Sequence, residues 1–374
     1  MIASYQPYQL KFKKPVLTSR GSMAYKNGYY ITIEHDGIKG IGECSFIEGL
    51  SVDRLDSFED ELRKTSADIE EIAEIYYDSD TLPSHLISHH PSLAFGLETA
   101  LLDYRNGGKH EIIKGSKFYQ GTQDIPINGL VWMGSDVFMR QQIEDKLANG
   151  FRCIKIKVGA IDFKEECRLI ENIRKNYSPT QIEIRLDANG AFNENNVRER
   201  LNILSQYTIH SIEQPIKPQQ YLLMYQLCRE NIIPIALDEE LIGTHQNDMR
   251  QKLLETIRPQ YIILKPSLLG GMAECNEWIK IAQSLNIGWW ATSALESNIG
   301  LNAIAQWAAS AVSSLSNVSP LLGRGVGGKD EGPGVRCQGL GTGSLYENNI
   351  ASPMFIESGH LRYDPDRIWA DNIS

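Results

Sequence analysis

Apolar and polar positions follow two alternating periods along most of the chain. From residue 125 onward, short runs of β-branched and aliphatic residues, such as CIKIKVG and YIILKPS, alternate with longer segments that have apolar residues at three- and four-residue spacing. The short runs are typical of buried strands, and the longer segments are typical of amphipathic helices. Seven such strand–helix units in succession predict parallel strands with right-handed crossovers. We therefore predict a (β/α)7β barrel over residues 119–345, although periodicity alone also allows an open, doubly wound sheet.

The N-terminal part has a different pattern. Residues 29–44 contain two β-rich runs around a turn at Asp36 and Gly37, which indicates a hairpin. Residues 18–24 are small and polar, which is typical of a loop. Residues 51–80 and 92–106 then have helical periodicity. This order predicts an α+β domain over residues 1–118, and the tail, residues 346–374, is predicted to return to it.

Composition narrows the class of protein. The formal net charge of −10 argues against a nucleic-acid or anionic-membrane partner, because both require a basic face. No run of 18 apolar residues is present, and the N-terminal stretch lacks the apolar core of a signal peptide. The six cysteines are scattered without a CxxC pair, which is typical of reduced thiols in a cytoplasmic protein. We expect a small-molecule substrate, and the oligomeric state stays open.

Polar or charged residues stand at the ends of successive predicted strands, at intervals of 25–30 residues. Each interval is close to the length of one strand–helix unit, so each residue stands at the same point of its unit. In a parallel barrel these points converge at the C-terminal mouth. The residues are Lys157, Asp187, Glu213, Asp238, Lys265 and Ser293.

Three of these residues are candidates for a metal site. Asp187, Glu213 and Asp238 would repel one another at neutral pH unless a cation lay between them, and carboxylate oxygens suit Mg²⁺. Each acid taken alone could instead be a helix N-cap or a turn residue. Asn189 and Glu239 are candidates for supporting residues beside the metal, and each could equally belong to a turn.

The lysines suggest the chemistry. Lys155 and Lys157 point to the same face of their strand, and we expect each ammonium group to lower the pKa of the other, which would make a usable general base. The alternative is a pair on a solvated strand face. Lys265 is predicted to lie on the opposite side of the mouth. One metal between opposed lysines fits the removal of a proton α to a carboxylate.

The motifs that hold these residues resemble those of the enolase superfamily, muconate-lactonising-enzyme subgroup. The matching stretches are KIK at 155–157, LDANG around Asp187, IEQP around Glu213, ALDEE around Asp238 and LKPS around Lys265. Within that subgroup, four more stretches resemble the o-succinylbenzoate synthases. They are GIGECS at 40–45, FGLETALLD at 95–103, TSALESNIGLNAIAQWAA at 292–309 and QGLGTGSLYENNI at 338–350.

The resemblance implies a fold, a cofactor and a reaction. The fold is an α+β capping domain over a (β/α)7β barrel. The cofactor is Mg²⁺, or Mn²⁺ in its place, on Asp187, Glu213 and Asp238. The reaction is the dehydration of 2-succinyl-6-hydroxy-2,4-cyclohexadiene-1-carboxylate to o-succinylbenzoate in menaquinone biosynthesis.

The resemblance also implies roles for individual residues. Lys157 would remove the α-proton and then protonate the departing hydroxyl, while Lys265 would stabilise the ene-diolate from the other face and Lys155 would tune Lys157. A loop at residues 19–23 would close over the substrate from the capping domain. The implied substrate contacts are Ser293, Leu295 and Glu296 in the barrel and Ser19, Arg20 and Gly21 in that loop.

Two alternatives remain open at this point. Relatives with the same lysines racemise N-acylamino acids or epimerise dipeptides, so a racemase or epimerase is the second hypothesis. A barrel that binds a ligand without catalysis is the third, and a missing lysine or carboxylate would have supported it, but none is missing. A Gly-rich segment, roughly residues 320–336, departs from the family pattern, and no role is predicted for it.

Overall fold

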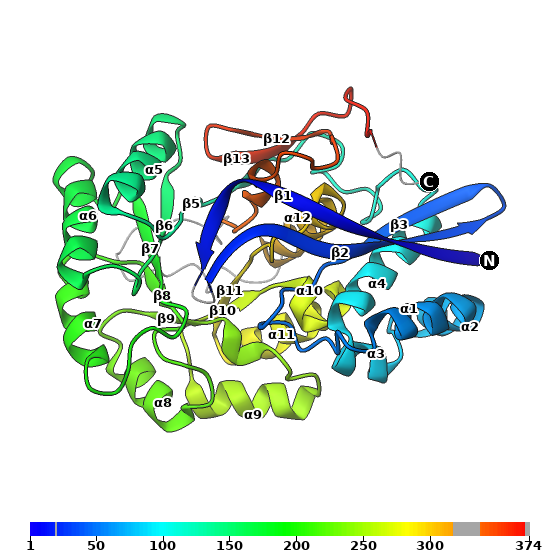
Figure 1. Ribbon diagram of the computed structural model, residues 1–374. Coiled ribbons are helices and arrows are strands. Elements are labelled where there is room, and N and C mark those ends of the chain that lie inside the picture. Colours follow the sequence, from blue (N-terminus) through cyan, green and yellow to red (C-terminus); the bar gives the residue numbers. More distant parts are fainter. Residues whose placement is uncertain (19–20, 317–336, 371–374) are drawn as a thin grey trace.

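The computed structural model describes residues 1–18, 21–316 and 337–370. Figure 1 shows a barrel of parallel strands ringed by helices, with an antiparallel sheet and a group of short helices packed against it. The predicted fold class, a (β/α)7β barrel with an N-terminal α+β cap, is confirmed. The domain boundaries at residues 118 and 345 stay predictions. The Gly-rich segment at residues 320–336 lies outside the described residues.

The cap begins with an antiparallel sheet in the order β1 (Ile2–Thr18), β2 (Gly21–His35), β3 (Ile38–Cys44). The predicted turn between the last two strands is present, with Asp36 and Gly37 both at positive φ. The predicted loop at residues 18–24 is wrong from residue 21 onward, because β2 begins there and Met23 pairs with Val16. Pairing along a long hairpin overrides the local turn preference of small residues.

Four helices complete the cap, and glycines let the longest of them lie close against the sheet. A Cβ atom on Gly42 would lie 1.8 Å from the carbonyl oxygen of Gly96, so a larger residue at position 42 would push α4 away from β3. The helices are α1 (Phe58–Ala67), α2 (Ile69–Ser79), α3 (Ser84–His89) and α4 (Pro91–Arg105).

Seven parallel strands form the barrel wall, and each pairs with its neighbours in chain order. Residues 338–339 close the barrel through parallel bridges to Ile127 and Thr292, at the first and last strands of the array. The seven strands are β5 (Gly129–Val131), β6 (Cys153–Lys157), β7 (Glu183–Asp187), β8 (Ser211–Glu213), β9 (Ile235–Leu237), β10 (Tyr261–Leu264) and β11 (Gly288–Ala291).

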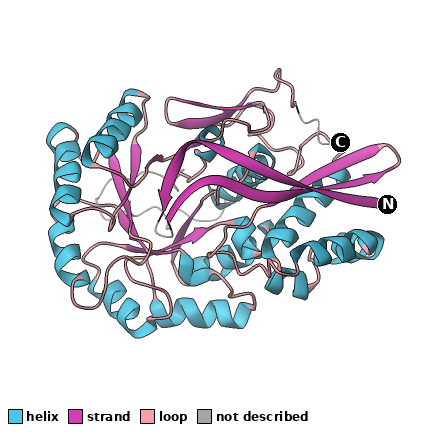
Figure 2. Cartoon of the chain, in the orientation of Figure 1, coloured by secondary structure: helices cyan, strands magenta, loops and turns pink. Residues whose placement is uncertain are grey.

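Helices surround the barrel, as Figure 2 shows. Ile154 and Ile156 on β6 are at most 1% exposed and belong to the core between strands and helices, so Cys153, Lys155 and Lys157 point into the barrel. In the described part of the chain, no helix is long and apolar enough to cross a membrane. The surrounding helices are α5 (Asp136–Ala148), α6 (Phe163–Asn176), α7 (Val197–Ser205), α8 (Tyr221–Glu230), α9 (Asn247–Ile257), α11 (Met272–Ser284) and α12 (Asn298–Ser316). Short turns of helix are η1 (Glu239–Leu241), α10 (Pro266–Leu269) and η3 (Thr342–Leu345).

The predicted first barrel strand, residues 125–133, is divided into two. β4 (Ile125–Pro126) leaves the barrel and pairs with β13 (His360–Tyr363), which pairs in turn with β12 (Met354–Glu357). The tail therefore adds a small sheet beside the barrel. Trp369, near the end of the tail, packs against a cluster that contains Tyr30 and Ile41 of the cap.

Two buried glutamates of the cap hold the N-termini of two barrel helices. Glu43 on β3 accepts hydrogen bonds from the backbone N–H groups of Ser297 and Gly300, each at 2.8 Å, at the start of α12. Glu98 on α4 accepts from the backbone N–H groups of Met272 and Ala273 at the start of α11. A carboxylate at a helix N-terminus meets free N–H groups and the positive end of the helix dipole. These contacts fix the cap on the barrel.

The free energy of unfolding is expected to fall as pH rises from about 4.5 to about 7 because of Glu98. Burial raises the pKa of Glu98 from 4.5 to about 7, although the two backbone N–H groups lower it. Between these values the folded protein holds the proton more tightly than the unfolded chain, so stability decreases by about 3 kcal/mol across the window. Glu98→Gln removes the titrating group. Urea denaturation at several pH values gives the unfolding free energies of wild type and variant. Their difference should change by about 3 kcal/mol between pH 4.5 and pH 7. A difference that stays constant with pH would contradict the prediction.

Candidate active site

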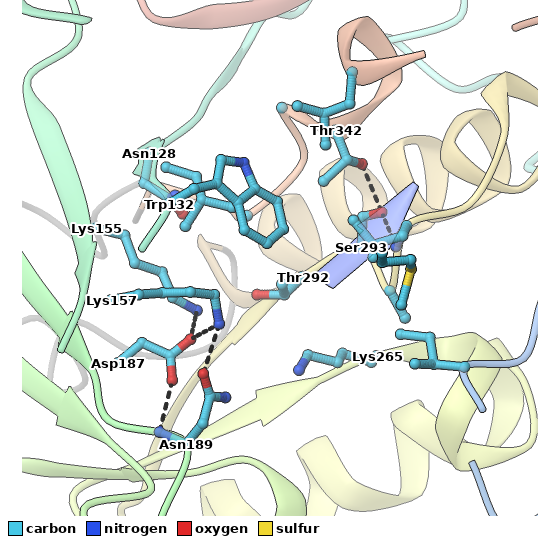
Figure 3. A pocket seen from close by; sticks show the side chains of 18 of the residues that line it. Asn128, Trp132, Lys155, Lys157, Asp187, Asn189, Lys265, Thr292, Ser293 and Thr342 are labelled. Atoms are coloured by element: carbon cyan, nitrogen blue, oxygen red, sulfur yellow. Dashed lines mark hydrogen bonds and ion pairs between the residues drawn. The ribbon is translucent and has the colours of Figure 1, made fainter. Parts of the chain in front are cut away.

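The predicted strand-end residues meet at one end of the barrel. Lys157 on β6 pairs with Asp187 on β7, and Asp187 pairs with Glu213 on β8. Asp238 directly follows β9, and Lys265 directly follows β10. Because parallel strands end at the same face, all five residues stand at the C-terminal mouth. In Figure 3, Lys157 and Asp187 lie on one side of the pocket and Lys265 lies on the other.

The lysine pair on β6 contacts two of the acids. Lys155 Nζ lies 3.1 Å from Asp187 Oδ2 and also contacts Glu213 Oε2. Lys157 Nζ lies 3.0 Å from the same Asp187 oxygen. The side chains of Asp187 and Glu213 are at most 3% exposed, so these ion pairs are largely removed from water. The alternative of a solvated strand face is therefore wrong for this pair.

Each side of the mouth has further polar contacts. Lys265 Nζ lies 2.5 Å from Asp238 Oδ2. Lys157 Nζ donates to Asn189 Oδ1 at 2.6 Å, and Asn189 Nδ2 donates to Glu239 Oε1 at 2.9 Å. Asn189 has a φ of 43°, a left-handed conformation that asparagine tolerates better than most residues. Of the two predicted supporting residues, Asn189 therefore contacts Lys157 directly, and Glu239 is joined to Lys157 through Asn189.

The predicted lowering of the pKa of Lys155 is wrong. Burial alone would lower it, but the carboxylates of Asp187, Glu213 and Asp238 outweigh burial and raise the pKa of Lys155 above its ordinary value. The same holds for Lys265, whose pKa is lowered by burial but raised overall, chiefly by Asp238. Repulsion between two isolated lysines would lower their pKa values, but here the three nearby acids have the larger effect on Lys155.

The acids have unequal electrostatic environments. Burial and the neighbouring acids Asp187 and Asp238 raise the pKa of Glu213 to about 7, although Lys155 lowers it. For Asp187, burial raises the pKa, but the lysines outweigh burial and lower it well below its ordinary value. Among the described residues, Glu213 Oε1 is buried without a hydrogen-bond partner.

The fit of these acids to a metal rests on their chemistry. In the described part of the chain, no three His, Cys, Asp or Glu side chains are grouped as a metal site, and lysine ammonium groups lie against the acids. Yet three carboxylates on adjacent strands, one with an unpartnered oxygen, supply the hard donors that Mg²⁺ prefers. The residues present therefore fit a hard divalent cation.

A cavity of about 310 Å³ lies above these residues. Its apolar wall comes from both parts of the chain, since Trp132 and Leu130 belong to the barrel while Ile47 and Leu50 belong to the cap. Lys157 Nζ lies 5.9 Å from the centroid of the Trp132 ring. Sequence reasoning missed these residues and three polar ones. The polar residues are Asn128, Thr292 and Thr342.

A sequence signal existed for part of this wall. Asn128, Leu130 and Trp132 are spaced two apart in the first barrel run, so they share one face. That period could have assigned them to the barrel interior. No local signal marks the cap residues, because only the packing of the cap on the barrel brings them to the cavity.

The predicted barrel contacts to substrate are divided between the cavity and the layer behind it. Ser293 and Leu295 line the cavity, and their contact with substrate stays a prediction. Glu296 does not line it. This carboxylate is fully buried and accepts hydrogen bonds from the hydroxyls of Ser267 and Ser293 and from the backbone N–H of Ala294 at 2.8 Å. Glu296 therefore holds the Ser293 hydroxyl from behind the cavity wall.

Of the three predicted substrate contacts from the cap, the structure describes only Gly21. Ser19 and Arg20 lie outside the described residues. Gly21 begins β2 and does not line the cavity, whereas Met23, two residues later, does. The end of the β1–β2 hairpin therefore reaches the cavity through Met23, the last residue of the predicted loop at residues 19–23.

Comparison with known proteins identifies the family and agrees with the fold. Residues 138–324 match the family described as "Enolase C-terminal domain-like". The o-succinylbenzoate synthase of Desulfotalea psychrophila is 44% identical over 96% of this chain and 98% of its own length. The crystal structure of MenC from the same organism has a TM-score of 0.79, with 40% identity over 97% of this chain and 99% of that chain.

A more distant relative is named for a different activity, the epimerisation of a dipeptide. The L-Ala-D/L-Glu epimerase of Bacillus subtilis is 25% identical over 60% of this chain and 61% of its own length. Its substrate-liganded structure has a TM-score of 0.75 at 18% identity, over 97% of this chain and 95% of that chain, which indicates a common fold. The identity to the synthase is much higher and extends over nearly the whole length of both chains. The chain therefore belongs to the enolase superfamily and, within it, to the o-succinylbenzoate synthase family.

Proposed function

We propose that the protein catalyses the Mg²⁺-dependent dehydration of 2-succinyl-6-hydroxy-2,4-cyclohexadiene-1-carboxylate to o-succinylbenzoate, a step of menaquinone biosynthesis. The observation that carries this proposal is the position of Lys157 and Lys265 on two sides of one cavity. Their strands, β6 and β10, are separated by the three strands that end in the acids. Membership of the synthase family supports the choice of reaction.

The metal would be held by Asp187, Glu213 and Asp238. When bound, Mg²⁺ supplies positive charge where negative charge develops on the carboxylate oxygens of the substrate. The unpartnered Glu213 oxygen supports this assignment, since a buried carboxylate oxygen normally has a partner. Mn²⁺ accepts the same oxygen donors and is expected to substitute.

Lys157 would carry the proton through the reaction. As the neutral amine it would remove the proton α to the ring carboxylate, and Asn189, which accepts a hydrogen bond from its Nζ at 2.6 Å, would hold it in position. The resulting ammonium would then give this proton to the departing hydroxyl, which leaves as water while the ring becomes aromatic. Lys265 would stay protonated and attract the developing negative charge from the other side.

The rest of the cavity suits a cyclic substrate with polar groups. The rings and chains of Trp132, Leu130 and Leu50 would pack against the cyclohexadiene ring, and the apolar wall would exclude water from the reacting carbon. Ser293 Oγ accepts a hydrogen bond from Thr342 Oγ1 at 2.7 Å, so this hydroxyl is held at a fixed place in the wall. It would position a polar group of the substrate.

Removal of divalent metal is expected to abolish the dehydration. The purified protein should form o-succinylbenzoate with Mg²⁺, lose that activity after treatment with EDTA, and regain it when Mg²⁺ is added in excess. The assay follows the absorbance of the aromatic product. Product formation that is unaffected by EDTA would contradict the metal assignment.

The same preparation separates the synthase from the related racemases and epimerases. Exchange of the α-proton with solvent deuterium without net loss of water, together with racemisation of N-acylamino acids or epimerisation of dipeptides, would replace the proposed reaction by one of these. Absence of dehydration, racemisation and epimerisation in a protein that binds Mg²⁺ would favour a barrel that only binds a ligand.

A further inference from the structure

One side of the barrel wall is not joined by hydrogen bonds along its whole height. The segment that closes the barrel, residues 338–345, is bridged to the first strand run at its start, where Ile127 pairs with Gln338 just before β5. Beyond that bridge, no backbone hydrogen bond among the described residues joins β5 to this segment. Leu130 on β5 and Gly341 in the closing segment both line the cavity, so the cavity extends to this unpaired part of the wall.

A lysine of α5 reaches the cavity at this place. Lys146 lines the cavity, and its stem lies against Gly129 at the start of β5. A Cβ atom on Gly129 would stand 2.9 Å from Lys146 Cγ and 3.0 Å from its Cδ, so the lack of a side chain on the strand leaves the room that the lysine occupies. Lys146 Nζ lies 4.9 Å from the centroid of the Phe151 ring. The ammonium group therefore comes to the cavity from a helix outside the barrel wall.

Lys146 differs in its partners from the other lysines of the cavity. Those three, Lys155, Lys157 and Lys265, each contact a carboxylate oxygen at 3.1 Å or less. Among the described residues, Lys146 Nζ forms no ion pair and no hydrogen bond, and the neighbouring Asp145 accepts a hydrogen bond within α5 instead. Burial lowers the pKa of Lys146, and the charge of Asp145 only partly offsets this effect. Lys146 is therefore a half-buried cation without a counter-ion in the described part of the chain.

The unmatched charge of Lys146 indicates an anionic group on the ligand. Removing an ammonium group from water is costly unless an opposite charge or an acceptor takes the place of the water. The substrate of the proposed reaction carries two carboxylates. The ring carboxylate belongs at the acids and lysines of the mouth, so the carboxylate at the end of the flexible succinyl arm needs a partner elsewhere. No arginine is found among the described residues that line the cavity, and Lys146 is the remaining lysine.

We propose that Lys146 binds the terminal carboxylate of the succinyl arm and thereby selects substrates that carry a second carboxylate. This inference rests on the proposed function. The arm leaves the ring carbon next to the one that bears the ring carboxylate, and it extends from the mouth toward the unpaired part of the wall. Lys146 contacts the arm and not the reacting carbon, so it contributes equally to the binding of the substrate and of the transition state.

The ammonium group also stands at the border of a second cavity. This cavity, of about 730 Å³, lies between the end of α5, the start of α12 and the β12–β13 hairpin. It shares Lys146, Phe151 and Ser344 with the first cavity. The described residues therefore leave open the space beyond Lys146, which gives room for both oxygens of a carboxylate and for water around it.

The experiment compares two ligands on the full-length protein with Mg²⁺ present. o-Succinylbenzoate carries both carboxylates, and 2-butanoylbenzoate has a methyl group in place of the terminal carboxylate. Titration calorimetry should show that the wild type binds o-succinylbenzoate about 10–100-fold more tightly, which is the size of a hydrogen bond between charged groups. In Lys146→Met, which keeps an apolar stem against Gly129, the two ligands should bind with similar affinity.

Two further variants separate the charge of Lys146 from its place in the fold. Lys146→Arg keeps a positive charge and should regain most of the preference for o-succinylbenzoate. Arg140→Met is the matched control, because Arg140 is also a cation of α5 but is 43% exposed, pairs with Asp136 at 3.0 Å and does not line the cavity. It should keep the full preference.

Steady-state kinetics with the cyclohexadiene substrate give a second readout. Lys146→Met should raise KM about 10–100-fold and leave kcat unchanged, because the lost contact is made equally in the substrate complex and in the transition state. A variant with a merely distorted site would lose kcat as well. A loss of kcat without a change in KM would therefore contradict the assignment.

The wild type alone can overturn the inference, so a variant that folds poorly does not decide the outcome. Equal binding of the two ligands by the wild type, or no binding of either, would overturn it, and so would an unchanged preference in Lys146→Met. Failure of the proposed function has a different result, in which the wild type forms no o-succinylbenzoate from the cyclohexadiene substrate. A ligand preference that is lost in Lys146→Met would then still assign Lys146 to a second carboxylate, because the titrations need no turnover.

Discussion

Lys157→Ala is expected to lower kcat for o-succinylbenzoate formation by about 10²–10⁴-fold, the usual contribution of a positioned general base. The amine of this residue is the group proposed to remove the α-proton, and its hydrogen bond to Asn189 fixes its direction. Alanine leaves the acids in place, so binding of Mg²⁺, measured by titration calorimetry, should be retained. The loss should therefore appear in kcat and not in metal affinity.

A surface lysine provides the control for this variant. Lys175 lies on α6, is 61% exposed and pairs with Glu171 at 3.1 Å, and it does not line the cavity. Lys175→Ala should leave kcat unchanged. Full activity in Lys157→Ala would contradict the proposed mechanism, and loss of Mg²⁺ binding in that variant would show that its effect is not confined to proton transfer.

Glu43→Ala is expected to lower the free energy of unfolding by about 3–5 kcal/mol. The fully buried carboxylate accepts hydrogen bonds from the backbone N–H and hydroxyl of Ser297, from the backbone N–H of Gly300 and from the Tyr8 hydroxyl at 2.5 Å. Alanine removes the acceptor of all four donors, and the three donors of Ser297 and Gly300 are buried. Because these donors belong to both the cap and the barrel, the variant should also weaken the attachment of one to the other.

Urea denaturation of the purified variants measures this effect. Glu34→Ala is the matched control, because Glu34 is also a glutamate of the cap sheet but is 54% exposed and lies 3.7 Å from Lys39. Its loss should change stability by about 0.5 kcal/mol or less. Equal stability of the two variants would contradict the idea that Glu43 holds the cap on the barrel.

The barrel and its charged mouth could be predicted because both depend on local pattern. Runs such as CIKIKVG carry the strand period, and the residues that end them must converge once the strands are parallel. Lys157, Asp187 and Glu213 are paired neighbours for this reason. The wall formed by Trp132 was within reach of the same reasoning, since it follows the period of the first strand.

The remaining features depend on contacts between distant parts of the chain. Glu296 stands in a stretch predicted to contact substrate, but its two serine partners draw it behind the wall. The raised pKa of Lys155 follows from acids on three other strands. The pairing of Gly21–Met23 with β1 likewise requires a partner strand that no local pattern identifies.

The shared wall of the cavity has a consequence for how this enzyme could change during evolution. The proposed proton-transfer residues stand on rigid barrel strands, whereas Met23, Ile47 and Leu50 reach the same cavity from the cap. Substitutions in the cap can therefore reshape what the cavity accepts without moving a single reacting group. In a laboratory selection for a new carboxylate substrate, we expect the first beneficial substitutions to accumulate in these cap segments, with Lys157 and Lys265 unchanged.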